Sequence, residues 1–219
     1  MKVVAIISEK GGAGKSTIAT NIAVVAEAAG LVTLIFDLDP RANSTVWGDA
    51  RPGGIPQVVA AQAPRLALLL SQAQAGGAGL VLIDTPGNAV DIAAAAAGVA
   101  DAILIPAQPA AFDLASIPKS VLIARASGKP FVVIINAAPV QGAETGEAIS
   151  AIEGQGVAVC PVVLHRRKAF TARAHEGLVA LDVEPNGKAA GEIRDLFAWV
   201  CDKVIMLPKK QTIKAKTKG

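Results

Sequence analysis

The sequence has few aromatic residues and no tyrosine: aromatic side chains make up 3% of its 219 residues. Proteins that bind single-stranded nucleic acid stack the bases on aromatic rings, so this composition argues against that class. Long apolar runs are also missing, because no stretch of about 18 apolar residues is free of charges and helix breakers, which argues against a membrane span. Residues 1–8 lack the basic and long apolar regions of a secretory signal, so we expect a cytoplasmic protein.

Cysteine is scarce as well, with only Cys160 and Cys201. Their separation matches no metal-ligand spacing, so we expect neither a zinc site nor a disulfide framework and interpret both as buried thiols. The net charge of +3 depends on the last eleven residues, which hold five lysines and no acid, since the rest of the chain has 16 basic and 18 acidic residues. We therefore predict one domain over residues 1–208 and a disordered Lys-rich tail over residues 209–219.

Short apolar, β-branched runs alternate with helical segments along the chain. The predicted buried strands are residues 2–8, 31–36, 80–84, 102–105, 131–136 and 157–163, and the predicted helices are residues 16–29, 64–75, 90–100, 113–127, 145–155 and 188–206. Residues 40–56 are rich in proline and glycine and predict a long loop. This alternation predicts an α/β fold, a mostly parallel twisted sheet with helices on both faces.

A glycine-rich turn joins the first predicted strand to the first predicted helix. Glycines let backbone N–H groups converge on a phosphate at a helix N-terminus. Lys15 is placed to reach the β- and γ-phosphates of a nucleotide, and the Ser16 hydroxyl is placed to ligate Mg²⁺. The turn therefore predicts a single P-loop domain. The residues expected to bind ATP are Gly11, Gly12, Ala13, Gly14, Lys15, Ser16 and Thr17.

The turn departs from the usual pattern GxxxxGK[ST], because Glu9 stands in place of the first glycine and Lys10 is an additional lysine. The pattern KGGxGK[ST] near the N-terminus resembles the deviant Walker A box of the ParA/MinD family of ATPases. The resemblance implies Mg²⁺-dependent ATP hydrolysis by a homodimer that forms on ATP binding. In such a dimer, Lys10 would reach the nucleotide of the partner subunit.

Two acidic motifs extend the resemblance. Asp37 and Asp39 lie in a segment that resembles the family's second acidic motif, which implies that Asp39 orients the attacking water with Asp37 close by, and that both are catalytic. The alternative is that the two acids only cap the following segment. Residues 80–83 are apolar and precede Asp84, as in a Walker B strand, so Asp84 is expected to hold Mg²⁺ through a water molecule. Residues 85–87 resemble the second switch loop.

Weaker matches lie farther along the chain. Asn136 follows a predicted strand at a position where the family often contacts adenine, and a role in capping the core is the open alternative. Residues 105–109 with Asp113 and Leu114 resemble the family's proline-rich strand end. Residues 165–193 resemble the C-terminal part of small ParA-type partition proteins. Arg41 stands where glutamine is common in the family. No segment precedes the first strand, so we do not expect the site-specific DNA-binding domain of larger partition ATPases.

The resemblance implies a function in DNA partition. An ATP-bound dimer of this type binds DNA nonspecifically, associates with the nucleoid, and releases DNA after hydrolysis stimulated by a centromere-binding ParB-like protein. The basic residues expected to contact phosphates are Arg166, Arg167, Lys168 and Arg173, unless they form only a solvated surface.

Two other functions remain open. One is a MinD-like ATPase that cycles on a membrane, but the chain after Pro208 offers only Ile213 as a bulky apolar residue, so no membrane partner is expected. The other is a cargo-positioning or regulatory switch whose output is a protein partner.

Overall fold

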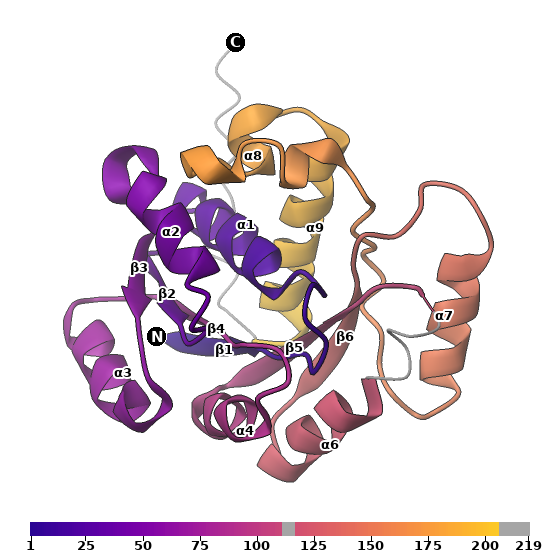
Figure 1. Cartoon of the computed structure of the whole chain (residues 1–219), viewed down its shortest axis with the longest axis horizontal. Helices are drawn as coiled ribbons and strands as arrows, with labels where there is room; N and C mark the ends of the chain where they lie inside the picture. The colour runs from indigo at the N-terminus through magenta and orange to yellow at the C-terminus, as the bar shows by residue number, and fades with distance from the viewer. Residues whose placement is uncertain (111–116, 206–219) are drawn as a thin grey trace.

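The computed structural model describes residues 1–110 and 117–205. Six strands form one parallel sheet in the order β3-β2-β4-β1-β5-β6, as Figure 1 shows. The strands are β1 (Lys2–Ile6), β2 (Thr33–Asp37), β3 (Gln57–Ala60), β4 (Leu80–Asp84), β5 (Ala102–Ala107) and β6 (Phe131–Ile135). Strands buried on both faces read as continuous apolar runs, which is why the sequence predicts most of them.

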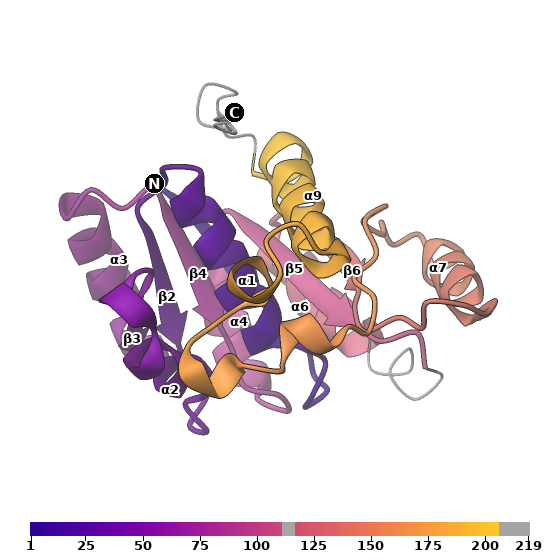
Figure 2. The ribbon, with the colours of Figure 1, turned by 90° about the horizontal axis from the view of Figure 1, so that it is seen from above.

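Helices cover both faces of the sheet (Figure 2). One face carries α1 (Lys15–Ala28), α2 (Asn43–Ala50), α8 (Ala180–Val183) and α9 (Lys188–Lys203), and the other carries α3 (Leu66–Ala75), α4 (Val90–Val99), α6 (Ile117–Ser127) and α7 (Glu144–Glu153). Successive strand residues point to opposite faces, so Val4 and Ile6 of β1 pack on the α1 side, whereas Val3 and Ala5 pack on the α4 side. The predicted α/β fold with helices on both faces is confirmed.

The predicted loop over residues 40–56 is wrong in part, because it contains α2. Trp47 of this helix is buried in the core on the α1 side, and the Asp37 carboxylate accepts hydrogen bonds from its first turn. Both contacts are tertiary, so they leave no local pattern in the sequence. The surrounding prolines and glycines predict a loop, and the helix is therefore not predicted. The edge strand β3, which follows this segment and pairs with β2, is also absent from the sequence prediction.

The predicted strand over residues 157–163 is likewise wrong. Only Val159 pairs with the sheet, through an isolated parallel bridge to Val133. Pro161 has no N–H group, so regular pairing cannot continue along this segment. The predicted helix over residues 113–127 is described from Ile117 onward as α6, while Asp113, Leu114 and the Lys-rich tail lie outside the described residues.

The register of the central strands brings three loops together. Ile6 of β1 pairs with Asp84 of β4, and Asp84 is also opposite Asp37 of β2. The loops that follow these three strands therefore leave the sheet side by side at its carboxyl edge. Ligands of open parallel sheets bind at such an edge.

Candidate functional site

A cavity of about 590 Å³ opens at the carboxyl edge of the sheet, a volume in the range of small-molecule sites. Its floor is the loop after β1 and the first turns of α1. One wall consists of the loop after β2 and α2, the second is residues 86–88 after β4, and the third comes from residues 170–178. Among the residues predicted to form the site, those that line the cavity are Gly11, Gly12, Gly14, Lys15, Ser16, Thr17 and Asp39.

The glycine-rich loop needs glycine at two positions because of its backbone. Gly12 and Gly14 have φ values of 82° and 94°, in the left-handed region that side chains disfavour. At Gly14 a Cβ atom would also lie 2.1 Å from Nδ2 of Asn136. This Asn136 amide donates a hydrogen bond of 2.8 Å to the Ala13 carbonyl. Asn136 and Ala13 thus support the loop from behind and do not line the cavity.

Lys15 is the first residue of α1 and is only 6% exposed. Its ammonium group donates to the carbonyl oxygens of Ser8 at 3.3 Å and Lys10 at 3.2 Å, so it lies curled within the loop. Burial lowers the pKa of Lys15 below its ordinary value, while the charges of Asp84 and Asp39 oppose that change. A cation held beside backbone N–H groups at a helix N-terminus can receive an anion such as a phosphate.

Asp84 is fully buried at the end of β4. Its Oδ2 accepts a hydrogen bond of 2.7 Å from the Ser44 hydroxyl. Burial raises the pKa of Asp84 to about 6, although the Ser16 and Ser44 hydroxyls and the charge of Lys15 oppose the increase. The other oxygen, Oδ1, is buried and has no hydrogen-bond partner within the described part of the chain.

These residues fit a magnesium ion that is shared with a nucleotide. Mg²⁺ takes oxygen ligands and is usually held by one or two protein groups together with phosphates. Asp84 offers an unpartnered buried oxygen, and the Ser16 hydroxyl lies near it. In residues 1–110 and 117–205, no group of three or more His, Cys, Asp or Glu side chains could hold a metal alone. The remaining ligands would therefore be nucleotide oxygens and water.

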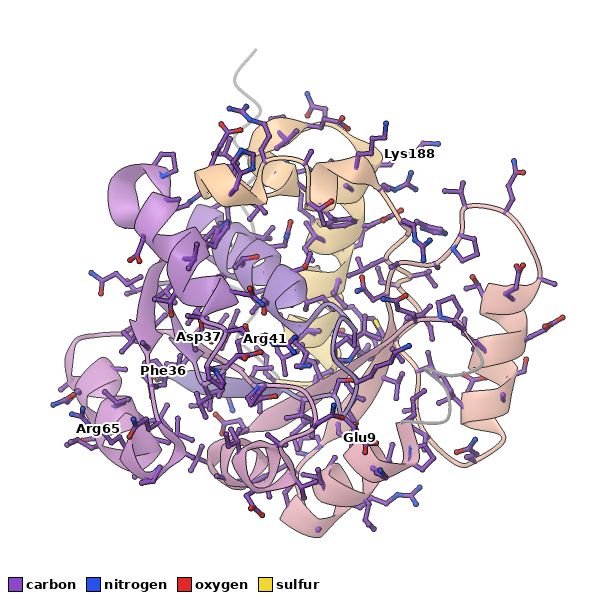
Figure 3. The ribbon with its side chains drawn as sticks, in the orientation of Figure 1. Glu9, Phe36, Asp37, Arg41, Arg65 and Lys188 are labelled. Carbon is purple, nitrogen blue, oxygen red and sulfur yellow. The ribbon has the colours of Figure 1, made fainter. Side chains whose placement is uncertain are left out.

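The two acids after β2 have different surroundings. Asp37 is 3% exposed, and its Oδ2 accepts hydrogen bonds from the Thr45 backbone at 2.8 Å and the Thr45 hydroxyl at 2.9 Å. Its Oδ1 accepts from the Asp39 backbone at 3.0 Å, so Asp37 caps α2 and holds the turn before it. Asp39 is half-buried and lines the cavity, with Oδ1 accepting from the Arg41 backbone at 2.9 Å. Figure 3 labels Asp37 and Arg41 on this stretch of chain.

The loops around the cavity are also tied to one another. Glu9 on the loop after β1 forms an ion pair with Lys119 of α6, and its carbonyl accepts from the Asn88 backbone at 2.7 Å. A Cβ on Gly87 would lie 2.9 Å from the Gly11 nitrogen, which shows how closely residues 85–87 pack on the glycine-rich loop. Lys10, the additional lysine, is half-buried on the same loop but does not line the cavity.

The predicted basic cluster is partly neutralised. The Arg167 guanidinium donates to Glu192 at 2.6 and 2.9 Å, and Arg173 donates to Glu176 at 2.5 and 2.9 Å. Arg166 and Lys168 are exposed. Two of the four basic residues, Arg167 and Arg173, therefore have acidic partners. None of the four lines the cavity.

Sequence reasoning missed Ser44 and the third wall of the cavity. Ser44 lies in the segment predicted as a loop, and a serine there carries no distinguishing signal. The third wall contains Phe170, Thr171 and Leu178, which are brought to the site only by the path of the chain after β6.

A phosphate-binding loop at the carboxyl edge of a parallel sheet, with a buried lysine and a buried carboxylate, defines a P-loop nucleotide-binding domain. A family model of the CobQ/CobB/MinD/ParA nucleotide binding domain matches residues 4–180. The chain belongs to this family of nucleotide-binding domains.

Relatives with known names agree with this membership. The maintenance of carboxysome distribution protein A of Gloeobacter kilaueensis is 37% identical over 86 residues, which are 39% of this chain and 38% of that protein's length. The MinD cell division protein of Aquifex aeolicus has a TM-score of 0.74 at 17% identity, covering 95% of this chain and 99% of that one.

A third comparison is an ATP complex of a single-residue variant of McdA from Cyanothece. It has a TM-score of 0.70 at 16% identity, covering 92% of this chain and 95% of the other. At these identities the solved structures establish the shared fold. None of the helices in the described residues is long and apolar enough to cross a membrane.

Proposed function

We propose that this chain is a Mg²⁺-dependent ATPase of the positioning type, whose cargo is a protein assembly. The observation that carries the choice of cargo is the 37% identity, over 86 residues, to a protein named for maintaining carboxysome distribution. That match spans 38% of the relative's length, so the cargo and the partner of this chain are part of the proposal. The support for ATP hydrolysis is the convergence of Lys15, Ser16, Asp39 and Asp84 at one edge of the sheet.

In the proposed reaction Lys15 contacts the β- and γ-phosphates, and Ser16 and Asp84 hold Mg²⁺, which neutralises phosphate charge when bound. Asp39 orients the attacking water, because it is the acid that lines the cavity. Asp37 acts through its cap on α2 and does not meet the substrate. We assign Lys10 to the nucleotide of the partner subunit in an ATP-bound homodimer.

DNA partition with a ParB-like partner is the second candidate. The observation in its favour is the exposure of Arg166 and Lys168, two cations that could contact DNA phosphates. The acidic partners of Arg167 and Arg173 reduce the charge of the same surface. Nucleoid association belongs to this candidate.

The test is a nucleotide-dependent purification. The tagged chain would be isolated with a non-hydrolysable ATP analogue or with ADP, each with and without nuclease treatment. A partner protein retained only with the analogue and resistant to nuclease supports the protein-cargo function. A partner lost on nuclease treatment, together with binding of a DNA duplex only in the presence of the analogue, favours DNA partition instead.

The control is Lys15→Gln, which removes the cation that faces the phosphates. It should bind neither ATP nor any partner in these purifications. If Lys15→Gln binds ATP as tightly as the parent chain, the assignment of the cavity as the ATP site is wrong. Phosphate release by the parent protein in Mg²⁺, compared with release in EDTA, tests hydrolysis directly.

A further inference from the structure

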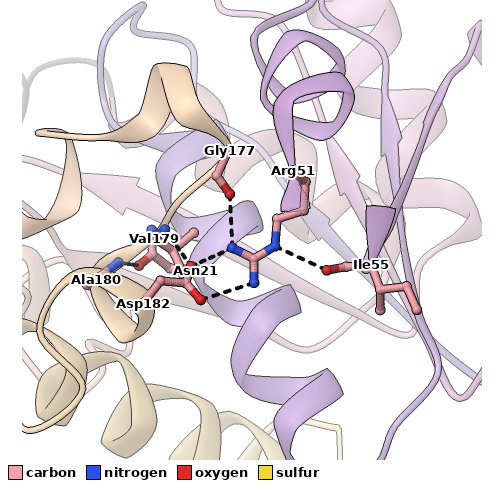
Figure 4. A network of polar contacts seen from close by, with 7 residues as sticks. All are labelled: Asn21, Arg51, Ile55, Gly177, Val179, Ala180 and Asp182. Carbon is pink, nitrogen blue, oxygen red and sulfur yellow. Dashed lines mark hydrogen bonds and ion pairs between the residues drawn. The ribbon is translucent and has the colours of Figure 1, made fainter. Parts of the chain in front are cut away.

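Arg51, the residue after α2, forms hydrogen bonds through all three nitrogens of its guanidinium group (Figure 4). Its Nε donates to the Ile55 carbonyl at 3.1 Å, and one terminal nitrogen donates to the Gly177 carbonyl at 2.9 Å. Both terminal nitrogens meet the Asp182 carboxylate, so the pair is bidentate. The guanidinium also lies 5.4 Å from the centre of the Trp47 ring. The Arg51 side chain is 10% exposed and that of Asp182 is 26% exposed, so solvent reaches the pair mainly from the Asp182 side.

These contacts join two walls of the cavity. Asn43, Val46 and Trp47 form the wall that belongs to α2, and residues 170–178 form the wall that faces it. Within the described residues, every hydrogen bond between residues 39–55 and residues 170–183 comes from the Arg51 side chain. The two segments also touch at Gly177, where a Cβ would lie 2.4 Å from the Arg51 backbone nitrogen.

The same network continues to the floor of the cavity. Asp182 accepts a hydrogen bond of 2.9 Å from the Val179 backbone, which fixes the start of α8. The next backbone N–H, that of Ala180, donates to Asn21 Oδ1 at 3.1 Å. Asn21 Nδ2 in turn donates to the Thr17 carbonyl at 2.8 Å, and Thr17 lines the cavity beside Ser16.

We propose that Arg51 is a positioning residue that holds the α2 wall against residues 170–178 and thereby slows nucleotide release. The proposal rests on the proposed nucleotide site. Arginine is suited to this position because its planar guanidinium group can donate hydrogen bonds to Asp182, Gly177 and Ile55 at once, whereas a lysine ammonium is a single point charge. When the link is broken, the two walls separate more often and the bound nucleotide escapes faster.

The experiment measures the dissociation rate of a fluorescent ADP analogue by stopped flow, because ADP avoids any contribution from ATP-dependent dimer formation. Arg51→Gln should release the analogue about tenfold faster, the change expected when a charge-assisted link is lost. Arg51→Lys should fall between the parent and Arg51→Gln. Arg65→Gln is the matched control, since Arg65 is exposed at the start of α3, outside the network (Figure 3), and should leave the rate unchanged.

Asp182→Asn provides a second route to the same link. It should accelerate release, and the double variant with Arg51→Gln should match the faster single variant, because partners in one interaction are not additive. Thermal unfolding of each variant is recorded in parallel. A lower Tm with an unchanged dissociation rate would overturn the proposal, because Arg51 would then only stabilise the fold. If the parent chain binds no ADP, the proposed nucleotide site fails first, which is a distinguishable result.

Discussion

The buried carboxylate of Asp84 should make the nucleotide-free protein less stable than a variant with a neutral side chain at this position. Its pKa is raised from 3.8 to about 6, mainly by burial. Asp84→Asn keeps the shape and removes the charge, but it adds an amide group with two N–H donors, of which the Ser44 oxygen can accept only one, so the second donor reduces the gain. Since one pKa unit corresponds to about 1.4 kcal/mol, the shift sets an upper estimate of roughly 3 kcal/mol for the gain in unfolding free energy at neutral pH.

The difference in unfolding free energy between Asp84→Asn and the parent should also depend on pH. The folded-state pKa lies above the unfolded-state value, so protonation of Asp84 stabilises the folded protein fully below about pH 4. That stabilisation is lost as the pH rises through about 6. Between about pH 5 and pH 7.5 the parent should therefore lose about 1 kcal/mol that Asp84→Asn does not lose.

Urea unfolding in EDTA without nucleotide, followed by tryptophan fluorescence, measures both effects. The stability gap between Asp84→Asn and the parent should widen from pH 5 to pH 7.5. Asp49→Asn is the matched control, because Asp49 is an exposed aspartate on α2. A gap that stays constant or narrows over this pH range would refute the reasoning. In Mg²⁺ with ADP the order should reverse, because Asp84→Asn loses a group proposed to hold the ion.

Three further predictions concern the loops of the site. Asp39→Ala should bind ATP but not release phosphate, and should accumulate as an ATP-bound dimer on size-exclusion chromatography; normal turnover would show that another residue orients the water. Lys10→Ala should bind ATP yet dimerise and turn over less, and behaviour identical to the parent would exclude the role across the dimer. Gly14→Ala should cost about 2 kcal/mol of unfolding free energy, because its Cβ meets Asn136 in a left-handed backbone, whereas Gly11→Ala, with no atom within 4 Å of its Cβ, should not.

The floor of the site could be predicted from the sequence because it is local. The turn from β1 to α1 is contiguous, and its glycines are needed by the backbone itself, as the φ of 94° at Gly14 shows. Asp84 could be predicted because it ends a buried apolar strand and follows the first two motifs in the order and spacing that the family resemblance implies. Parallel strands end at one edge of the sheet, so the alternation of strands and helices already placed these groups near one another.

The walls of the site could not be predicted, because they depend on contacts between distant segments. The contact that supports the loop from behind has the same origin, because the Asn136 amide donates to the Ala13 carbonyl, 123 residues away in the sequence. Arg51 follows a helix that the sequence hides, and its partner Asp182 is 131 residues away. Neither of these contacts between distant residues leaves a recognisable pattern in the composition or in the spacing of apolar residues.

The two acids after β2 differ in their hydrogen-bond partners, which lie partly outside their own motif. Asp37 and Asp39 belong to one short motif, in which the family resemblance implies that Asp39 orients the water, with capping of the following segment by both acids as the alternative. The difference comes from Thr45, whose backbone and hydroxyl both donate to Asp37. A carboxylate with three such donors is committed to the turn, because reaching a water molecule in the cavity would leave buried donors unpaired. Asp39 accepts one such hydrogen bond, from the Arg41 backbone, and lines the cavity, which supports the proposal that Asp39 orients the attacking water.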